Sequence, residues 1–517
     1  MKIHFKRHSF LVIMLFICII IVGCNTTNDE TEESAGRDES DTPVQGGELT
    51  AGYYSDASSY DPLLASSGGD ETILYLIYDR LVDYGLNFEP IPALAESWEN
   101  IDNKTWKFNL REGVTFHDGT EFNAEAVKFN IERANSDSSN KSDLQSIESV
   151  EVVDSHTVQF HLSEPNSGLL QALMTAAGMM VSPTAVEEYG DQYALHPVGT
   201  GPFKLVERNP GNEMQFEKFD DYWQEDKPYL DKVTVKVMQE STMVNALKSG
   251  EVDIVAPISA VNKQDLESSV NINVDVSSSL NFQYIYINTS LPPLDNQKVR
   301  QAIQYAIDRE QIVQAIQFGE GEAATGIFPK EHPAYRSDSA ITYDQAKAKQ
   351  LLEESGVTEL SFDMLVKPDA FDLRIAEAVQ AQLAEVGIQV NLEPTEVTTL
   401  VDLAFSKAEY PATLARASGR PDPNALISLY YQEHSFYNPG RHANRELESL
   451  IKQAKEETDD AERMNVIAES SRIAIEEDAM GIPLFFEPMI VAFHEKVKGY
   501  EPHQYGKPRF PFLWLED

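Results

Sequence analysis

The sequence predicts an α/β protein with at least two packed units. Three helix-like segments each end at a glycine. The last of them, from about 372 to 386, passes through Gly387 into a strand in which Ile388, Val390 and Leu392 alternate with polar residues. Helix–glycine–strand units are typical of α/β folds. The chain has 517 residues, whereas one hydrophobic core stops growing at about 250–300 residues, so we expect two or more lobes.

Local patterns predict the other elements. Residues 48–54 have the composition of a first strand. Asn123 is suited to cap one helix, and Asp308 and Asp344 are suited to open two more. Apolar and polar residues alternate in three further segments, which we expect to be half-buried strands: Trp106, Phe108 and Leu110; Val158, Phe160 and Leu162; Val233, Val235 and Val237.

Composition excludes several classes of protein. The 84 acidic residues outnumber the 41 Lys and Arg residues and give a formal net charge of -43. Nucleic acid is therefore excluded as a partner, because phosphate binding needs a clustered basic surface. The hydrophobic content of 42% excludes a wholly disordered chain, and two cysteines are too few for a disulfide-stapled scaffold.

The N-terminus has the pattern of a lipoprotein signal peptide. Basic residues precede an apolar run over 10–22, which is shorter than the about 20 residues that span a bilayer and suits the core of a signal peptide. The run ends in Ile-Val-Gly-Cys, which resembles a bacterial lipobox. We therefore expect residues 1–23 to be removed and Cys24 to be diacylated. The alternative is an uncleaved membrane anchor.

The segment after Cys24 supports the lipoprotein interpretation. Residues 24–47 are rich in Thr, Ser, Asp and Glu and show no apolar periodicity, so we expect a solvated, disordered tether. The protein would then be held by its lipid on the outer face of the cytoplasmic membrane, as in a Gram-positive bacterium.

Motifs along the rest of the chain resemble family-five extracellular solute-binding proteins, the peptide/nickel group that serves ABC importers. The matching stretches occur in the same order as in that family: residues 92–98 (PALAESW), 105–114 (TWKFNLREGV), 116–120 (FHDGT), 124–129 (AEAVKF), 199–205 (GTGPFKL), 295–303 (DNQKVRQAI) and 482–485 (IPLF). An ordered series over nearly the whole mature chain is far more specific than one short motif.

The resemblance implies an α/β, two-lobed periplasmic-binding-protein-like fold of class II type, with an extra α/β subdomain in lobe I. By motif order, lobe I takes 48–85, 181–284 and 483–517, the extra subdomain takes 86–180, and lobe II takes 285–482. Chain crossings near Asn288 and Pro483 would form the hinge, and closure of the lobes would bury the ligand. A monomer that delivers its solute to an ABC permease and ATPase complex is expected.

Patterns for enzyme chemistry are weak. The sequence contains no HExxH arrangement for a metal and no GxSxG nucleophile elbow, and the expected acylation of Cys24 leaves no free thiol. His434 and His442 lie in a loop-like region and are only a weak indication of a metal site. We therefore expect no enzyme, no cofactor and no metal site.

The stretch 415–424 (ARASGRPDPN) resembles the binding loop of lobe II, which in peptide-binding members presents an aspartate to the ligand's amino terminus. Here Arg420 stands near the place of that aspartate, and Asp422 follows two residues later. The usual tryptophan is absent, and Arg416 or Ala417 stands near its place. Guanidinium groups bind carboxylate or phosphate, so an anionic ligand is favoured. Alternatively, Asp422 caps a helix and Arg420 pairs with a surface acid.

Other candidate ligand-binding residues follow from the same resemblance. Lys367 occupies the place where a dipeptide-binding member has an arginine for the ligand carboxylate, and Ser66 and Ser67 lie in a loop that lines the cleft in relatives. Phe282 and Tyr284 alternate on a strand near the hinge and are expected to stack on a ligand. Each of these residues could instead belong to the core.

Two classes of function remain from the sequence. The first is a lipid-anchored receptor that captures a small peptide-like or anionic solute for an importer. The second is a surface lipoprotein on the same fold that acts as a sensor, adhesin or chaperone, and the fold alone does not separate them. Within transport, the candidate solutes are short peptides, glutathione-like peptides, a nickel chelate and opine-like anions.

Overall fold

A computed structural model describes residues 42–65, 69–86, 88–136, 144–502 and 508–516. The chain from Pro43 to Asp517 forms one compact unit. Cys24, most of the expected tether, Ser66 and Ser67 lie outside the described residues. Among the helices that are described, none combines the length and the apolar character needed to span a bilayer.

A seven-stranded sheet contains the first strand of the fold, β1 (Glu48–Tyr53), which pairs in parallel with β10 and β11. In the order of the sheet its strands are β12 (Ile272–Ser277), β19 (Met489–His494), β11 (Ile254–Val255), β1, β10 (Lys232–Val237), β9 (Glu213–Lys218) and β8 (Phe203–Asn209). Val233 and Val235 are buried as the alternation predicts. The associated helices are α1 (Asp70–Ile77), α4 (Pro183–Tyr189), α5 (Glu240–Ser249) and α6 (Ala260–Glu267).

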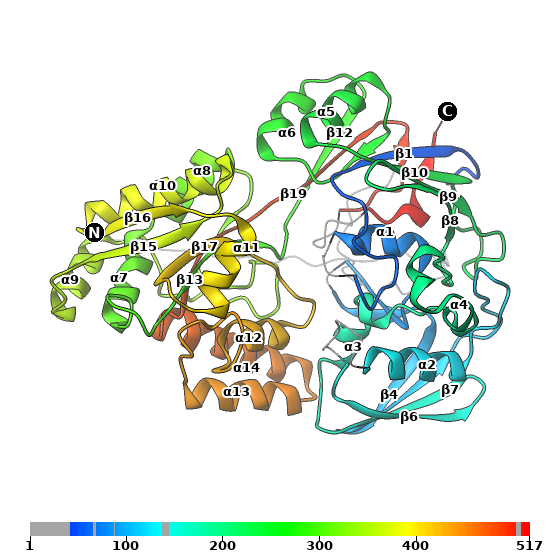
Figure 1. Cartoon of the computed structure of the whole chain (residues 1–517), viewed down its shortest axis with the longest axis horizontal. Helices are drawn as coiled ribbons and strands as arrows, with labels where there is room; N and C mark the ends of the chain where they lie inside the picture. Colours follow the sequence, from blue (N-terminus) through cyan, green and yellow to red (C-terminus); the bar gives the residue numbers. More distant parts are fainter. Residues whose placement is uncertain (1–41, 66–68, 87, 137–143, 503–507, 517) are drawn as a thin grey trace, which may run out of the picture. The chain divides into compact units, whose positions relative to one another are not determined.

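A second, four-stranded antiparallel sheet lies within the range predicted for the extra subdomain. Its strands, in order, are β4 (Ala95–Asp102), β5 (Thr105–Leu110), β7 (Thr157–Leu162) and β6 (Ile147–Asp154). Helix α2 (Ala124–Ala134) packs against β6 and β7, and Asn123 caps it by accepting hydrogen bonds from the backbone N–H groups of Glu125 and Ala126. The short helix α3 (Leu169–Leu173) follows β7 (Figure 1).

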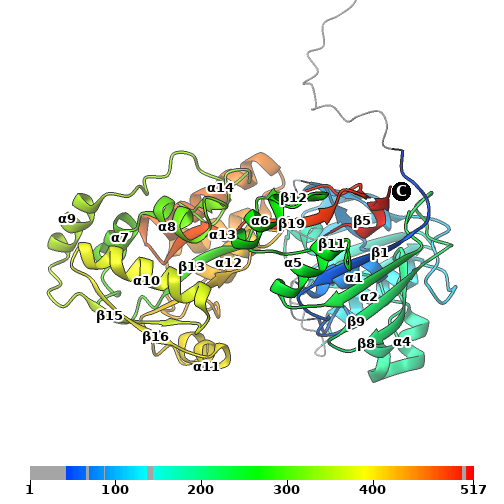
Figure 2. The same ribbon diagram turned by 90° about the horizontal axis from the view of Figure 1, so that it is seen from above.

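A six-stranded mixed sheet forms the other half of the unit. Its strands, in order, are β14 (Glu322–Ala323), β18 (Gly481–Phe486), β13 (Phe282–Ile287), β17 (Ala412–Ala417), β15 (Ser361–Val366) and β16 (Gln389–Pro394). Helices α7 (Gln297–Ala306), α8 (Arg309–Ile316), α9 (Gln345–Ser355) and α10 (Ala370–Glu385) share one hydrophobic core with this sheet. Both views show α7 and α9 side by side (Figure 1 and Figure 2).

The opposite face of the six-stranded sheet packs on another set of helices, α12 (Pro423–Tyr431), α13 (Arg445–Glu456) and α14 (Asp460–Arg472). The side chains of strand β13 point alternately into two cores. Ile285 and Ile287 lie in the core with α7–α10. Phe282, Tyr284 and Tyr286 lie in the core with α12–α14. This alternation follows from the period of two in a strand, and here both faces are covered, so all six residues of β13 are buried.

The predicted helix caps are confirmed, although α8 ends at Ile316, before the glycine at position 319 where its end is predicted. Asp308 caps α8 by accepting from Gln311 N, and Asp344 caps α9, which ends at Gly356 in the left-handed conformation. Helix α10 begins at Ala370, two residues before the predicted start, because Asp369 provides the cap.

The remaining elements are short. They comprise β2 (Val82–Tyr84), β3 (Pro90–Pro92), β20 (Val497–Lys498), β21 (Trp514–Leu515), α11 (Val397–Val401), the 3-10 helices η1 (Ala176–Gly178), η2 (Gly190–Leu195) and η5 (Phe510–Phe512), and the π-helical segments η3 (Asp402–Ser406) and η4 (Ile473–Glu477).

The pairing of β13 and β18 bears on where the chain passes between the two halves. Both strands pair only within the six-stranded sheet, whereas β12 and β19 belong to the seven-stranded sheet. The limits predicted at 284/285 and 482/483 therefore run through β13 and β18. We propose crossings at 278–281 and 487–488, with the ranges for the lobes otherwise as predicted.

Candidate ligand-binding cavity

A cavity of about 990 Å³ lies between two groups of residues that are distant in the sequence. One wall comes from the chain around α3, over residues 145–175, and the other comes from the binding-loop region, α12 and α13, over residues 420–455. Small-molecule sites occupy about 300–1,000 Å³, so the volume suits a solute at the upper end of that range.

The two walls touch through the protein's own groups. The backbone N–H and the hydroxyl of Ser167 both donate to the carbonyl oxygen of Lys455, at 3.0 and 3.1 Å. The Lys455 ammonium lies 3.4 Å from a carboxylate oxygen of Glu164. The side chains of this last pair are partly exposed, so it contributes at most about 1 kcal/mol, and the Ser167 hydrogen bonds define the contact better.

Asp422 lies where the second wall begins, and its carboxylate is held by three donors. As the N-cap of α12 it accepts from the backbone N–H groups of Asn424 and Ala425, each at 3.1 Å. The buried guanidinium of Arg463 lies 2.5 Å from its Oδ1 atom. The helix-capping alternative therefore describes the local role of Asp422, although the residue also lines the cavity.

Arg420 also lines the cavity, two residues before this cap. Burial raises the pKa of the neighbouring Tyr430 to about 12, and the positive charge of Arg420 acts in the opposite direction. Of the predicted site residues that lie in the described ranges, Arg420 and Asp422 are the two that the structure brings together at the cavity.

Arg416 and Lys367 lie elsewhere and have acidic partners. Arg416 is on β17, and its Nε atom is 3.0 Å from the carboxylate of Glu487. Lys367 Nζ is 2.5 Å from Asp372 and 3.5 Å from Asp369, at the start of α10. Burial acts to lower the pKa of Lys367, but the two carboxylates outweigh burial and hold that pKa above its ordinary value.

Phe282 and Tyr284 are core residues, which corrects the expectation that they stack on a ligand. Phe282 is fully buried between Tyr284 and Phe486, with ring centroids 5.5 and 5.4 Å away. The Tyr284 hydroxyl lies 3.0 Å from the Tyr431 hydroxyl, and burial raises the pKa of Tyr284 well above its ordinary value. The physical reason is that α12–α14 cover the face of β13 on which Phe282 and Tyr284 lie. The alternating pattern in the sequence does not show whether that face is covered.

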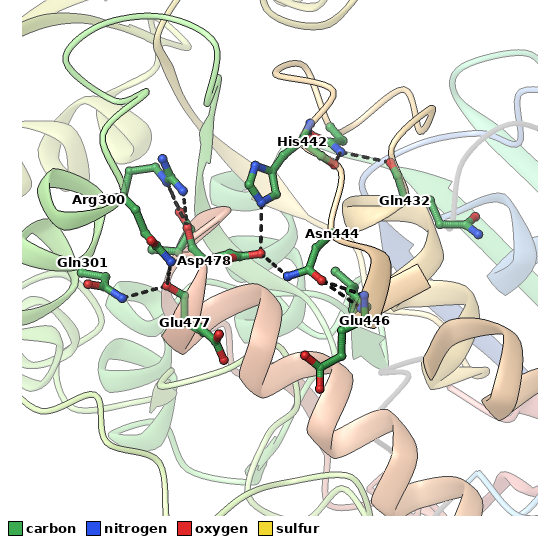
Figure 3. Close-up of polar contacts among 12 residues, drawn as sticks. Arg300, Gln301, Gln432, His442, Asn444, Glu446, Glu477 and Asp478 are labelled. Atoms are coloured by element: carbon green, nitrogen blue, oxygen red, sulfur yellow. Dashed lines mark hydrogen bonds and ion pairs between the residues drawn. The ribbon is translucent and has the colours of Figure 1, made fainter. Parts of the chain in front are cut away.

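The rim segment, residues 432–444, joins α12 to α13, and its first residues line the cavity. Its far end is fixed by Asp478: His442 Nε2 is 3.0 Å from Asp478 Oδ2, and Asn444 donates to the same oxygen at 2.7 Å (Figure 3). Burial acts to raise the pKa of Asp478, but these hydrogen bonds prevail and hold it below its ordinary value.

Arg300 supports the same cluster from α7. Its guanidinium donates to the backbone oxygen of Asp478 from Nε and Nη2, at 3.0 and 2.6 Å, and Gln301 donates to the backbone oxygen of Glu477 (Figure 3). The motif around Arg300 marked the family, but no sequence signal connected it with His442 or Asp478. The Arg300–Asp478 contact joins residues 178 apart in the chain, and the His442–Asp478 contact joins residues 36 apart.

The charged groups that line the cavity have both signs. Four carboxylates and two cations lie there: Glu164, Asp422, Glu433, Glu448, Arg420 and Lys455. Within the described ranges, no group of three or more His, Cys, Asp or Glu side chains is arranged to hold a metal ion. His434 lines the cavity, whereas His442 bonds to Asp478.

The fold and the cavity are those of a two-lobed solute-binding protein of the periplasmic-binding-protein type. Residues 89–438 match the family model for bacterial extracellular solute-binding proteins, family 5. The chain belongs to that family.

Curated and solved relatives agree with this assignment. The glutathione-binding protein GsiB of Escherichia coli O1:K1 / APEC is 30% identical over 471 residues, which cover 88% of this chain and 91% of that protein. DppA of Helicobacter pylori, solved with the peptide STSA, matches with a TM-score of 0.79 and 28% identity over 92% of this chain and 99% of its own. AppA of Bacillus subtilis, solved with a nonapeptide, gives a TM-score of 0.77 and 25% identity over 92% and 100%. The two-lobed fold predicted from the sequence is confirmed.

Proposed function

We propose that this chain is the solute-binding component of an ABC importer and captures a small peptide-like solute in the 990 Å³ cavity between α3 and α12. The cavity carries the proposal, because its walls come from segments more than 200 residues apart and meet through their own hydrogen bonds. A ligand that contacts both walls stabilises the arrangement in which they are together.

The charges of the cavity favour a solute that has both acidic and donor groups. Arg420 is positioned to hold a carboxylate of the solute, because a guanidinium binds carboxylates in a bidentate way. The four carboxylates around it disfavour a purely anionic solute. A peptide carries a carboxylate together with several N–H groups, and the relatives include a glutathione-binding protein and two proteins solved with peptides. A solute that is an anion without hydrogen-bond donors matches the cavity less well.

The cellular setting belongs to the same proposal. The lipobox-like sequence before Cys24 supports a diacylated, membrane-attached protein. The proposal further includes that the protein is a monomer, is not an enzyme and passes its solute to a permease. The relatives come from Gram-negative and Gram-positive bacteria, and a lipid anchor is compatible with either envelope. The proposed protein is therefore lipid-anchored, in a bacterium with either type of envelope.

The test is to identify what the protein binds. Protein purified gently from its native host is denatured, and the released small molecules are identified by mass spectrometry. Ligand-free protein is then screened against a defined tripeptide library that includes glutathione. A ligand at 100 times its Kd stabilises the fold by about 2.7 kcal/mol, which gives a clear rise in Tm. We expect a peptide-like compound in both experiments. If the protein releases no peptide and responds to no member of the library, the proposed function is wrong.

A further inference from the structure

Three residues that line the cavity each have a buried side-chain oxygen with no hydrogen-bond partner among the residues that the structure describes. They are Gln171, Asn424 and Ser428. Buried polar atoms in folded proteins are almost always paired, so three exceptions on residues that line one cavity require a physical explanation. They are distinct from Arg420 and Asp422, the two predicted residues that the structure places at this cavity.

The arrangement places these oxygens on both walls. Asn424 and Ser428 are four residues apart on α12 and therefore share one face of that helix, whereas Gln171 is on α3. Asn424 is only 1% exposed, and its amide nitrogen donates to the Ile451 carbonyl at 3.1 Å. Because that nitrogen must point at the carbonyl, the unpartnered atom of Asn424 is its oxygen, which is an acceptor.

We propose that Gln171, Asn424 and Ser428 form a subsite that accepts hydrogen bonds from N–H groups of the bound solute. Amide oxygens only accept, and a serine hydroxyl both accepts and donates, so the complementary group is an N–H donor such as a peptide amide or an amine. The carboxylates of Glu433 and Glu448 on the same cavity add to this preference. The inference rests on the proposed function. It adds that oxygens on both walls bind the N–H groups of the solute.

Loss of the unpaired oxygens has opposite consequences for binding and for stability. A buried acceptor without a partner destabilises the free protein, so its removal leaves the ligand-free fold as stable as before or more stable. The same removal weakens the complex, because a ligand N–H group is then buried without an acceptor. Structural hydrogen-bonding residues behave differently, because their removal lowers the stability of the free protein.

The experiment is isothermal titration calorimetry of the full chain in detergent. The probe is the tightest-binding member of the tripeptide library, together with its analogues that are N-methylated at one nitrogen at a time. The variants are Ser428→Ala and Gln171→Met. The matched controls are Ser449→Ala and Gln453→Met, which change exposed residues of α13. We expect each cavity variant to bind the probe about five- to tenfold more weakly and each control to bind as wild type.

The N-methylated analogues provide the decisive comparison. Methylation of the N–H that pairs with Ser428 or Gln171 is expected to weaken binding to wild type but to have little further effect on the matching variant. Cavity variants that bind the probe as tightly as wild type would show that these oxygens bind only water, and the subsite would be rejected. An equal penalty for N-methylation in wild type and variants also rejects it. If no library member binds wild type, the proposed function fails first and the subsite fails with it.

Discussion

Gly168 and Asp422 lie so close across the two walls that a β-carbon added to Gly168 would be 2.8 Å from Asp422 Cγ and 3.3 Å from Arg463 Nη2. Gly168 has a φ of -89°, a conformation open to any residue, so glycine is needed here for space. Asp422 cannot move aside cheaply, because it caps α12 and pairs with Arg463. The two walls can therefore come this close only because the residue at position 168 is a glycine, which has no side chain.

Gly168→Ala is expected to weaken ligand binding while each wall keeps its fold. Overpacking costs about 1–3 kcal/mol, and here the cost arises only when the walls are together, so the affinity falls about 5- to 150-fold. Titration calorimetry with the library ligand measures the change. Gly326→Ala is the control, because its new β-carbon has only one neighbour within 4 Å, Ser471 Oγ at 3.7 Å. Unchanged affinity in Gly168→Ala would show that the walls do not need this contact to hold the ligand.

Lys367→Met is expected to lower stability without changing ligand affinity. The variant leaves the buried carboxylate of Asp372 without its cation, at a cost of about 1–3 kcal/mol, below the value for a fully buried pair because the ammonium is partly exposed. Burial already raises the pKa of Asp372, and Lys367 opposes that rise.

The pH dependence of this loss follows from the raised pKa. Without Lys367 the pKa of Asp372 rises further, so the loss is small below the ordinary value of 3.8 and grows as the pH increases above it. Urea unfolding at pH 4 and pH 7 measures both values. A loss that is equal at the two pH values, or a clear fall in affinity, would contradict the assignment of Lys367 to a structural ion pair.

Asp478→Asn is expected to loosen the rim segment. The ionised carboxylate accepts from His442 and Asn444, and hydrogen bonds to a charged acceptor contribute about 1.5–3 kcal/mol each. The pKa of Asp478 is held low, so its contribution is fully present above the ordinary value of 3.8 and is lost as the pH falls through the lower folded value. The variant should therefore differ most from wild type near pH 7, and hydrogen exchange should increase in residues 432–444. Exchange at the wild-type rate would show that Asp478 does not hold the rim.

Cys24→Ala tests the anchor. Two acyl chains hold a protein firmly to a membrane, whereas a single chain binds marginally. The variant is therefore expected to remain as unprocessed precursor or to be released, and intact-mass analysis of membrane and soluble fractions distinguishes these forms. Recovery of a mature, lipid-modified protein from the membranes of Cys24→Ala cells would show that another residue carries the lipid.

The sequence predicts the fold well because its signals are local. The caps at Asn123, Asp308 and Asp344 and the alternating strands each depend on residues within one turn or one strand, and all lie where the patterns place them. The start of α10 was displaced by two residues because Asp369, an equally good cap, precedes Asp372.

The site is less predictable because its contacts join distant segments. The alternation of Phe282 and Tyr284 correctly indicates a strand, but it does not show that α12–α14 cover the face on which they lie. The pairing of Ser167 with Lys455 spans 288 residues and has no local signature. The unpaired state of Gln171, Asn424 and Ser428 is likewise visible only once the chain is folded.

The most direct test of ligand capture in this cavity is titration of the library ligand into wild type, Arg420→Ala and Arg416→Ala. Arg420 lines the cavity, and Arg416 pairs with Glu487 and does not line it. Loss of one partner of a buried charge pair costs about 2–5 kcal/mol, so Arg420→Ala should bind at least about 30-fold more weakly. Arg416→Ala should keep the wild-type affinity. Wild-type affinity in Arg420→Ala, or an equal loss in both variants, would contradict capture of the solute's acidic group at this cavity.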